Sequence, residues 1–250
     1  MISSLWIAKT GMDAQQKNLD NITNNLANVN TRGFKKQIPI FQDLMYQQIA
    51  NGSNMIQQGT GVKEVSADRI FTQGNLQQTG NPLDLAIQGD GFLTFTNIDG
   101  SDQYSRDGSL KLNSDGVIVN QNGLKLKPEI TIPVGSTNIQ ISTDGKVSAT
   151  LPGATSPSVI STITLKRFVN NQGLESLGNN MYKETDSSGK PEELVPGTSN
   201  IGTISQGFIE TSNVDVAEEL IKMISAQRAF ELNSKAIQAS DQMLQKLTQL

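Results

Sequence analysis

The side chains that most often carry catalysis are missing from this sequence. The chain of 250 residues contains no His and no Cys. Without His there is no imidazole base, no Ser-His-Asp triad and no histidine ligand for zinc. Without Cys there is no reactive thiolate and no disulfide. Cysteine usage therefore does not indicate whether the protein occupies a reducing or an oxidising compartment. The 24 Asp and Glu residues remain as candidates for a catalytic carboxylate pair.

Acidic residues beside glycine are the first candidates for a metal site. Asp99-Gly100, Asp107-Gly108 and Asp115-Gly116 recur at a spacing of eight residues. That spacing is compatible with a calcium-binding repeat, but the Gly-Gly-x-Gly-x-Asp signature is absent. An EF-hand is excluded as well, because Phe95 occupies the first ligand position of a loop through Asp99. With Asn122-Gly123 and Asp144-Gly145, these dipeptides predict tight hairpin turns instead.

Other site motifs are incomplete. Gly145-Lys146 and Gly189-Lys190 lack the upstream Gly and the following Ser or Thr of a phosphate loop, and Gly89-Asp90-Gly91 lacks the third Gly of a dinucleotide fingerprint. A pair of carboxylates could still be brought together for glycoside hydrolysis by the fold, although nothing marks one. We therefore expect no enzyme, no cofactor and no metal, and a secreted carboxylate hydrolase remains a remote alternative.

The overall composition excludes further classes. Lys and Arg number 20 against 24 acidic residues, which gives a net charge of −4, and aromatic residues make up 5%. No stretch is basic enough for a nucleic-acid groove with stacking aromatics. No apolar run has the length of a membrane span, and the N-terminus lacks the pattern of a secretory signal. We expect no nucleic-acid partner, no membrane span and no export by a cleaved signal.

The N-terminal stretch predicts a long helix with one apolar stripe. Its apolar residues alternate four-and-three spacing, and only Gln15 is polar in the row Met1, Leu5, Ala8, Met12, Gln15, Leu19, Ile22, Leu26 and Val29. Such a stripe requires a partner helix and imposes a left-handed supercoil. We expect a cap at Ser3 or Ser4 and a C-cap at Gly33.

Asparagines crowd the second half of this predicted helix, where their amides compete for backbone hydrogen bonds. Two interpretations stay open: the helix frays toward Gly33, or the amides bond neighbouring helices. Beyond the asparagines, Arg32, Lys35 and Lys36 form a basic cluster beside Phe34, which is typical of a solvated helix end.

The C-terminus predicts a second long helix, because no Pro or Gly occurs from Val216 to Leu250. Asp215 with Glu218 resembles a capping box. Apolar residues recur every seven positions from Val216, and Leu220 falls in the intervening position. We predict that the two terminal helices pair as a coiled coil. The predicted assembly seam consists of Leu5, Met12, Leu19, Ile22, Leu26, Val216, Leu220, Met223, Phe230, Ile237 and Leu244.

Between the helices the pattern is that of β-structure. Short, mostly alternating apolar runs are separated by turn residues: 83–87, 92–95, 110–112, 117–119, 124–126, 130–132, 139–141 and 163–165. The fold class is therefore α+β, with a mostly antiparallel β domain flanked by the terminal helices.

We expect four regions in the chain. Residues 1–36 form the N-terminal helix, residues 74–210 the β domain and residues 211–250 the C-terminal helix. Residues 37–73 connect the first helix to the β domain, with a short helix around Phe41 to Ile49 and a loop from Asn51 to Gly61.

Several motifs in this order resemble the bacterial flagellar rod and hook proteins. The stretch 24–35 is similar to their N-terminal signature, and 210–220 with 227–235 is similar to their C-terminal one. Residues 73–92 and 104–108 resemble their central motifs. The resemblance covers essentially the whole chain. The first eleven and last ten residues are most similar to the members that form the distal rod, although Tyr46–Val62 is shorter than in those members, where this region is associated with rod stiffness.

The resemblance implies a subunit of a hollow helical shaft that transmits motor torque to the hook. It implies self-assembly, contacts with neighbouring rod, hook and ring proteins, and a location in the rod that crosses the periplasm. Export would use the flagellar type III apparatus without a cleaved signal. A proximal rod or hook-type subunit is the alternative within the family, and a soluble coiled-coil binding module is the alternative outside it.

Overall fold

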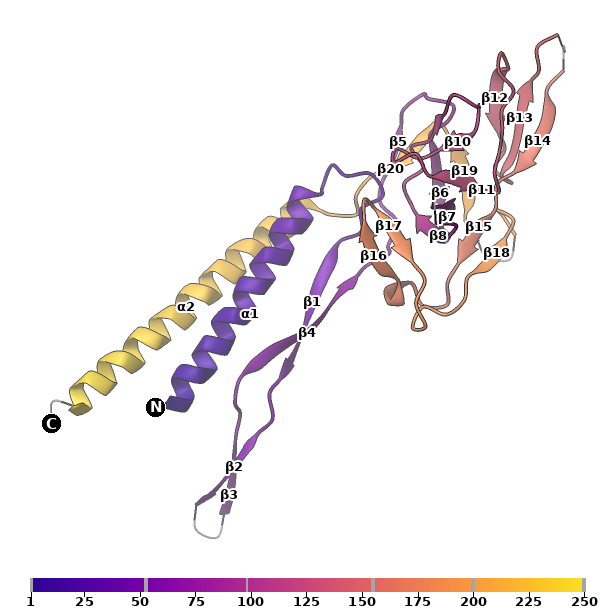
Figure 1. Cartoon of the computed structure of the whole chain (residues 1–250). Helices are drawn as coiled ribbons and strands as arrows, with labels where there is room; N and C mark the ends of the chain where they lie inside the picture. The colour runs from indigo at the N-terminus through magenta and orange to yellow at the C-terminus, as the bar shows by residue number, and fades with distance from the viewer. Residues whose placement is uncertain (1, 52–53, 98, 154–155, 199–200, 249–250) are drawn as a thin grey trace. The chain divides into compact units, whose positions relative to one another are not determined.

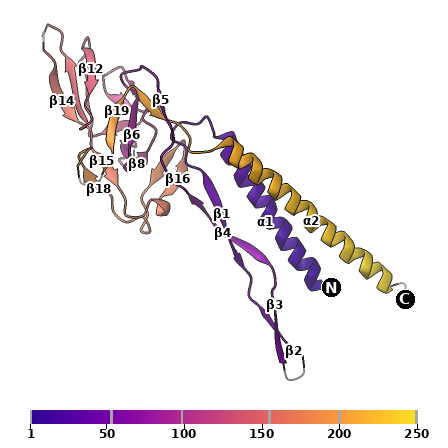
Figure 2. The same ribbon diagram turned by 180° about the vertical axis from the view of Figure 1, so that it is seen from behind.

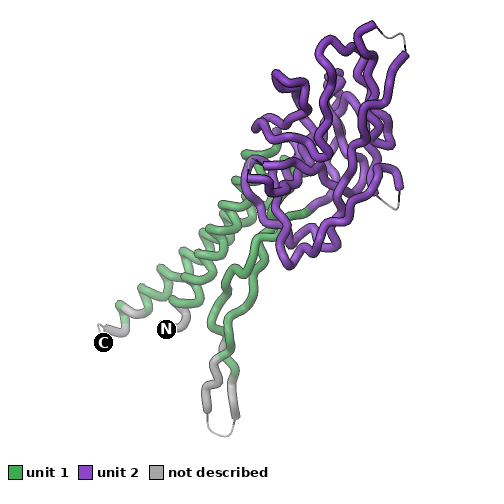
Figure 3. The backbone as a smooth tube through the Cα atoms, turned by 45° about the vertical axis from the view of Figure 1, so that its right-hand side comes forward, with its two compact units in different colours: residues 1–29, 36–70, 214–250 green, residues 30–35, 71–213 purple. Residues whose placement is uncertain are grey.

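The computed structural model of the chain describes residues 2–51, 54–97, 99–153, 156–198 and 201–248. Two compact units emerge from it, interleaved along the sequence (Figure 3). Unit 1 consists of Met1–Val29, Lys36–Ile70 and Val214–Leu250. Unit 2 consists of Asn30–Lys35 and Phe71–Asn213. The chain therefore passes from unit 1 into unit 2 and back twice.

Unit 1 is built around the two terminal helices. Helix α1 spans Ile2–Ala27 and α2 spans Val216–Thr248. They lie side by side and antiparallel, with the two chain ends at the same end of the pair (Figures 1 and 2). Asp215 caps α2 as predicted, because its Oδ1 accepts the backbone N–H of Ala217 at 2.8 Å and of Glu218 at 3.2 Å. The pairing of the terminal helices is confirmed.

The ends of α1 differ from the prediction. The helix already includes Ile2, so neither Ser3 nor Ser4 is its cap. It stops at Ala27, six residues before the expected C-cap Gly33. The asparagines account for the early end, because the Asn28 side chain donates to the Asn24 carbonyl at 2.9 Å and so competes with the helical bonding. Gly33 does have a positive φ of 65°, but in a segment of unit 2.

The connecting segment is a hairpin rather than a short helix and a loop. Strand β1 (Gln37–Asp43) pairs antiparallel with β4 (Val62–Arg69), with an irregularity in register at Ile40/Phe41. Beyond them, β2 (Gln47–Asn51) pairs with β3 (Asn54–Gln58). The prediction of a short helix was wrong because a short run of apolar residues has no decisive period.

Unit 2 is an antiparallel β-structure, as predicted. Its largest sheet has the order β16-β17-β8-β7-β11-β10-β9. These strands are Glu175–Gly178, Met181–Lys183, Asp102–Ser105, Leu93–Thr96, Lys125–Lys127, Ile118–Val119 and Lys111–Leu112. A second sheet has the order β12-β13-β14, with strands Thr137–Ile141, Lys146–Thr150 and Ser158–Thr162.

Three strand pairs complete unit 2. They are β15 (Leu165–Arg167) with β18 (Glu192–Leu194), β19 (Thr203–Gln206) with β6 (Leu85–Gln88), and β20 (Phe208–Glu210) with β5 (Leu76–Gln78). The core draws fully buried apolar side chains from several sheets, among them Leu85, Phe95, Ile118, Val147 and Leu165. The α+β fold class is thus confirmed.

Four of the five predicted turn dipeptides are turns with a left-handed glycine. Their φ values are 76° at Gly100 and Gly116, 81° at Gly123 and 78° at Gly145. Asp107-Gly108 is different, because Gly108 lies against the backbone of Leu85. A Cβ on Gly108 would lie 1.8 Å from the Leu85 carbonyl oxygen. This glycine serves close packing of two backbone segments.

Candidate assembly site

The buried side chains on the face of α2 that packs against α1 are small or polar. Glu219, Ala226 and Ser240 lie seven or fourteen residues apart on α2, and each is at most 9% exposed. On α1, the buried residues include Ala14 and Ile22. Gly11 of α1 lies so close to α2 that a Cβ there would be 3.1 Å from the Asn233 Nδ2. The helices therefore approach closely over small side chains.

Asn25 is the polar centre of this interface. Its Nδ2 donates to the Gln37 carbonyl at 2.9 Å and its Oδ1 accepts the Gln37 N–H at 2.9 Å. The same Nδ2 donates to the Glu219 Oε2 at 3.2 Å, and Lys222 Nζ donates to the Glu219 Oε1 at 3.0 Å. One asparagine thereby joins α1, α2 and the start of β1. Asn21 and Asn28, in contrast, bond carbonyls of their own helix.

The predicted seam residues surround this interface rather than fill it. Ile22 is buried. Half-buried members are Leu5, Met12, Leu19, Leu26, Met223, Phe230 and Ile237. Val216 and Leu220 are 42% and 43% exposed, and the Leu244 side chain lies outside the described residues.

Other large apolar side chains of α2 are exposed. The exposed fraction is 65% at Ile221, 53% at Ile224, 66% at Leu232 and 53% at Met243. Periodicity missed the buried row because Glu219, Ala226 and Ser240 are polar or small. The larger apolar side chains of α2 are instead available to a further partner.

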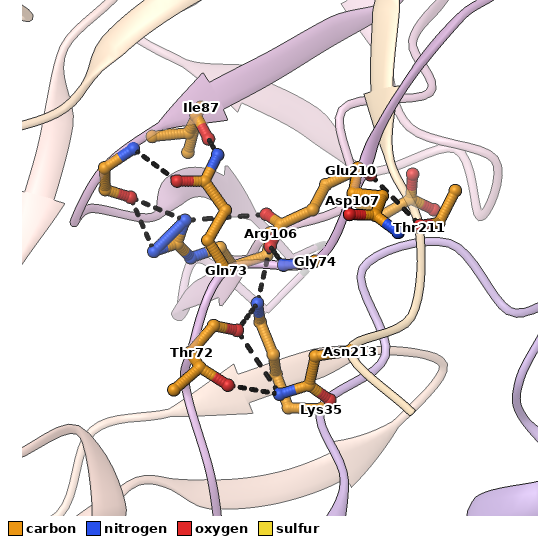
Figure 4. A network of polar contacts seen from close by, with 12 residues as sticks. Lys35, Thr72, Gln73, Gly74, Ile87, Arg106, Asp107, Glu210, Thr211 and Asn213 are labelled. Carbon is orange, nitrogen blue, oxygen red and sulfur yellow. Dashed lines mark hydrogen bonds and ion pairs between the residues drawn. The ribbon is translucent and has the colours of Figure 1, made fainter. Parts of the chain in front are cut away.

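Unit 2 contains a second feature that the sequence did not reveal, a cluster of buried charges (Figure 4). The side chains of Lys35 and Glu210 are 0% exposed and that of Arg106 is 2% exposed. Lys35 Nζ lies 2.5 Å from the Glu210 Oε1, and Arg106 Nη1 lies 3.5 Å from the Glu210 Oε2. We call these three residues the charge cluster. Lys35 is therefore not part of a solvated helix end.

Backbone groups complete the coordination of the charge cluster. The Gly74 N–H donates to the Glu210 Oε1 at 2.8 Å, and Lys35 Nζ donates to the Thr72 carbonyl at 2.7 Å. Arg106 donates through both Nη atoms to the Gly89 carbonyl, at 2.8 and 2.7 Å. Glu210 thus receives three donors and is the hub of the cluster.

The electrostatics of the charge cluster are dominated by burial. Burial lowers the pKa of Lys35, and the Glu210 carboxylate opposes that shift. Burial likewise lowers the pKa of Arg106, again opposed by Glu210. Glu210 therefore opposes the desolvation of both cations, and Asp90 adds to its effect at Arg106. Loss of Glu210 would leave Lys35 buried without a carboxylate partner and Arg106 with Asp90 alone.

The charge cluster joins segments that are distant in sequence. The Gly33 N–H donates to the Glu210 carbonyl at 2.9 Å, and the Asn213 side chain donates to the Thr72 Oγ1 at 3.0 Å. A Cβ on Gly33 would lie 2.9 Å from the Asp107 N, so only glycine fits against that backbone. Segments 30–35, 72–74, 105–108 and 210–213 meet here, and all of their residues except Thr72 lie within the family motifs. The chain segments next to both terminal helices are therefore held together in unit 2.

Within residues 2–248, apart from the gaps stated above, no group of three His, Cys, Asp or Glu side chains is arranged to hold a metal ion. In the same part of the chain, neither helix is sufficiently apolar over a membrane-spanning length.

Comparisons with known proteins agree along the whole chain. Three family descriptions match: "Flagella basal body rod protein" over residues 5–35, "Flagellar hook protein FlgE/F/G D1 domain" over residues 86–149, and "Flagellar basal body rod FlgEFG protein C-terminal" over residues 205–250.

Relatives that match over the full length of the chain are named flagellar basal-body rod protein FlgG. The flagellar basal-body rod protein FlgG of Buchnera aphidicola (subsp. Acyrthosiphon pisum) is 52% identical over 260 aligned positions, covering 100% of both chains. The FlgG proteins of Borreliella burgdorferi and Bacillus subtilis are 43% and 38% identical, covering 98% and 100% of this chain and 97% and 99% of theirs. The chain therefore belongs to the FlgG family of flagellar basal-body rod proteins.

Proposed function

We propose that this rod subunit assembles with further copies, through its terminal helices, into the hollow helical shaft of the distal rod and so transmits motor torque to the hook. The observation that carries the proposal is the unusual distribution of side chains on α2. Its small and polar row faces α1, while Ile221, Ile224 and Leu232 are more than half exposed. A helix that already has one partner and still exposes an apolar face is suited to a second.

The charge cluster supports this assembly by bringing the end of α1 and the start of α2 together. Ala27 and Val216 are separated by almost 190 residues, and closing such a loop has an entropic cost that grows with its length. The bond from Gly33 to the Glu210 carbonyl shortens the free chain to about ten residues. At about 0.6 kcal/mol per doubling of length, this favours helix pairing by roughly 2–3 kcal/mol.

The finer points of the proposal concern location and partners. We infer that the subunit is exported by the flagellar type III apparatus, lies in the rod that crosses the periplasm, and contacts neighbouring rod, hook and ring proteins. Its role is structural rather than enzymatic. A proximal rod or hook-type position is the alternative.

The length of the chain bears on its mechanical properties. The alignment of all 250 residues with the Buchnera relative extends over 260 positions, so this chain lacks ten residues that the relative has. If those ten residues belong to the segment Tyr46–Val62, the shaft built from this chain would differ in stiffness from that of the relative.

The substitution Ile224→Asp tests the proposed assembly. Ile224 is 53% exposed, so the charge should leave the monomer folded. In a shaft, the same charge would lie in an apolar contact of every subunit, and a buried unpaired charge costs several kcal/mol. Gln227→Asp adds the same charge at a polar, exposed position of the same helix and is the matched control.

Electron microscopy and sedimentation velocity at high protein concentration provide the measurement. We expect filaments from the wild type and from Gln227→Asp, and monomers with unchanged circular dichroism from Ile224→Asp. Normal filaments from Ile224→Asp would exclude this face as the contact. A wild type that stays monomeric, or that hydrolyses peptidoglycan, would overturn the proposed function itself.

A further inference from the structure

A groove in unit 1 has the composition of a binding site for an amphipathic ring. Its volume is about 550 Å³, and α1, α2 and β1 contribute to its walls. Apolar side chains of the lining include Ile22, Phe41 and Ala226, and amide side chains come from Asn18 and Asn21. The ion pair of Glu219 and Lys222 also borders the groove. The Asn21 Nδ2 is engaged by the Lys17 carbonyl at 3.0 Å, which leaves the amide oxygen as an acceptor.

The same unit exposes a side chain that would match this groove. Trp6 of α1 is the only tryptophan of the chain and is 55% exposed. The adjacent Ile7 is 36% exposed, and the Lys9 ammonium lies 5.5 Å from the Trp6 ring centroid. Tryptophan contributes a large apolar area together with one N–H donor, and it is enriched in protein interfaces for that reason. A groove that combines apolar side chains with amide acceptors satisfies both parts of the side chain.

Trp6 cannot enter the groove of its own chain. Sixteen residues of α1 separate it from Ile22, which at 1.5 Å per residue amounts to about 24 Å. At 100° per residue the two positions also lie roughly 160° apart around the helix. Trp6 and Ile22, which lines the groove, are therefore on nearly opposite faces of α1 and about 24 Å apart along its axis. A contact of this kind between copies is heterologous, and it repeats from copy to copy instead of closing on itself.

We propose that Trp6 of one subunit inserts into the groove of a neighbouring copy of this chain, displaced by about 24 Å along the helix axis. The proposal rests on the assembly proposed above and specifies one of its contacts. The two surfaces are complementary in polarity, because the groove offers apolar contacts and amide acceptors to the ring and its N–H. The contact would add a lateral or axial connection, and it would cover Ile221 of α2, which lines the groove.

The single tryptophan allows a direct test by fluorescence. On polymerisation of the wild type we expect a blue shift of Trp6 emission and a several-fold decrease in quenching by acrylamide. In the control, Trp6→Phe is combined with Val169→Trp, because Val169 of unit 2 is 96% exposed. If the emission of this control shifts less than that of the wild type, the shift is specific to Trp6. Polymers in which Trp6 remains as exposed and as readily quenched as in the monomer would overturn the proposal while leaving the proposed function intact.

Disulfide formation tests the identity of the groove. Because the chain has no native Cys, the double variant Trp6→Cys, Asn18→Cys carries the only thiols. The two positions are about 18 Å apart on one helix, far beyond the Cα separation of about 4–7 Å that a disulfide tolerates. Any disulfide therefore joins two copies.

We expect oxidation of mixed polymers of this variant with wild type to yield covalent oligomers. The pair Trp6→Cys, Val169→Cys should yield none. Filaments without cross-links would show that Trp6 is buried elsewhere and would overturn the assignment of the groove. Absence of any wild-type polymer would overturn the proposed function and this contact together.

Discussion

Replacing Glu210 should destabilise unit 2 more than replacing either of the cations that it holds. Glu210→Ala removes the acceptor of Lys35 Nζ, of Arg106 Nη1 and of the Gly74 N–H at once. Lys35 would remain buried without a counter-ion, and Arg106 would keep only the attraction of Asp90. Breaking a buried ion pair from one side costs about 3–5 kcal/mol. Unit 2 contains about 150 residues. At about 2–4 °C per kcal/mol for that size, the melting temperature should fall by roughly 6–20 °C.

Lys35→Met should be milder. The Glu210 carboxylate would keep the Gly74 N–H at 2.8 Å and Arg106 at 3.5 Å, and the ammonium that was costly to desolvate would be gone. We expect a loss of about 1–3 kcal/mol. As the control, Glu129→Gln breaks an exposed pair with Lys125 whose side chains are 52% and 51% exposed, and it should cost at most about 1 kcal/mol.

Urea unfolding followed by β-sheet circular dichroism measures all three variants. The expected order of destabilisation is Glu210→Ala, then Lys35→Met, then Glu129→Gln. Two results would refute the argument: a Glu210→Ala variant no less stable than Glu129→Gln, or a Lys35→Met variant less stable than Glu210→Ala. The first would mean that the charge cluster contributes no net stability, and the second that Glu210 is not its hub.

Three further substitutions test other contacts. Asn25→Ala removes the bonds to Gln37 and Glu219 and should lower the thermal stability of the helix pair by about 1–3 kcal/mol, whereas Asn24→Ala at an exposed neighbouring position should have little effect in far-UV circular dichroism. Gly108→Ala places a Cβ 1.8 Å from the Leu85 carbonyl oxygen and should destabilise unit 2 by at least about 1–3 kcal/mol in urea unfolding. Burial raises the pKa of the Asp107 carboxyl above its ordinary 3.8. The carboxyl therefore stays protonated to a higher pH in the folded chain than in the unfolded chain. Its contribution to stability is present at acid pH and is lost as pH rises from the unfolded pKa through the folded pKa. Asp107→Asn should therefore lose less stability than the wild type when pH is raised from acid to neutral, and a larger loss would contradict this account.

The elements that the sequence predicted best are those with a long or repeated signal. More than 30 residues without Pro or Gly after the Asp215 cap indicated α2, and that cap is present at 2.8 Å. Turn glycines such as Gly116 and Gly145 indicated an antiparallel β domain, because their positive φ requires glycine. The hairpin of β1 and β4 was missed, since its pairing joins residues that are up to 32 positions apart, as Gln37 and Arg69 are.

The candidate sites were less accessible to sequence reasoning. Periodicity identifies apolar rows, so it favoured Val216 and Leu220 over Glu219, which is 1% exposed. Whether Lys35 is solvated or buried depends on Glu210 and Arg106, at sequence separations of 175 and 71 residues. Local patterns carry no information on such partners. The sequence did, however, contain the family motifs in which Lys35, Arg106 and Glu210 lie.

A helical reconstruction of the assembled protein by electron cryomicroscopy would test the central claim most directly. We predict a hollow shaft in which α1 and α2 form the inner wall, and in which Ile224, 53% exposed in the single chain, is buried against a neighbouring subunit. A shaft whose inner wall is formed by unit 2, with α2 exposed along its length, would contradict assembly through the terminal helices.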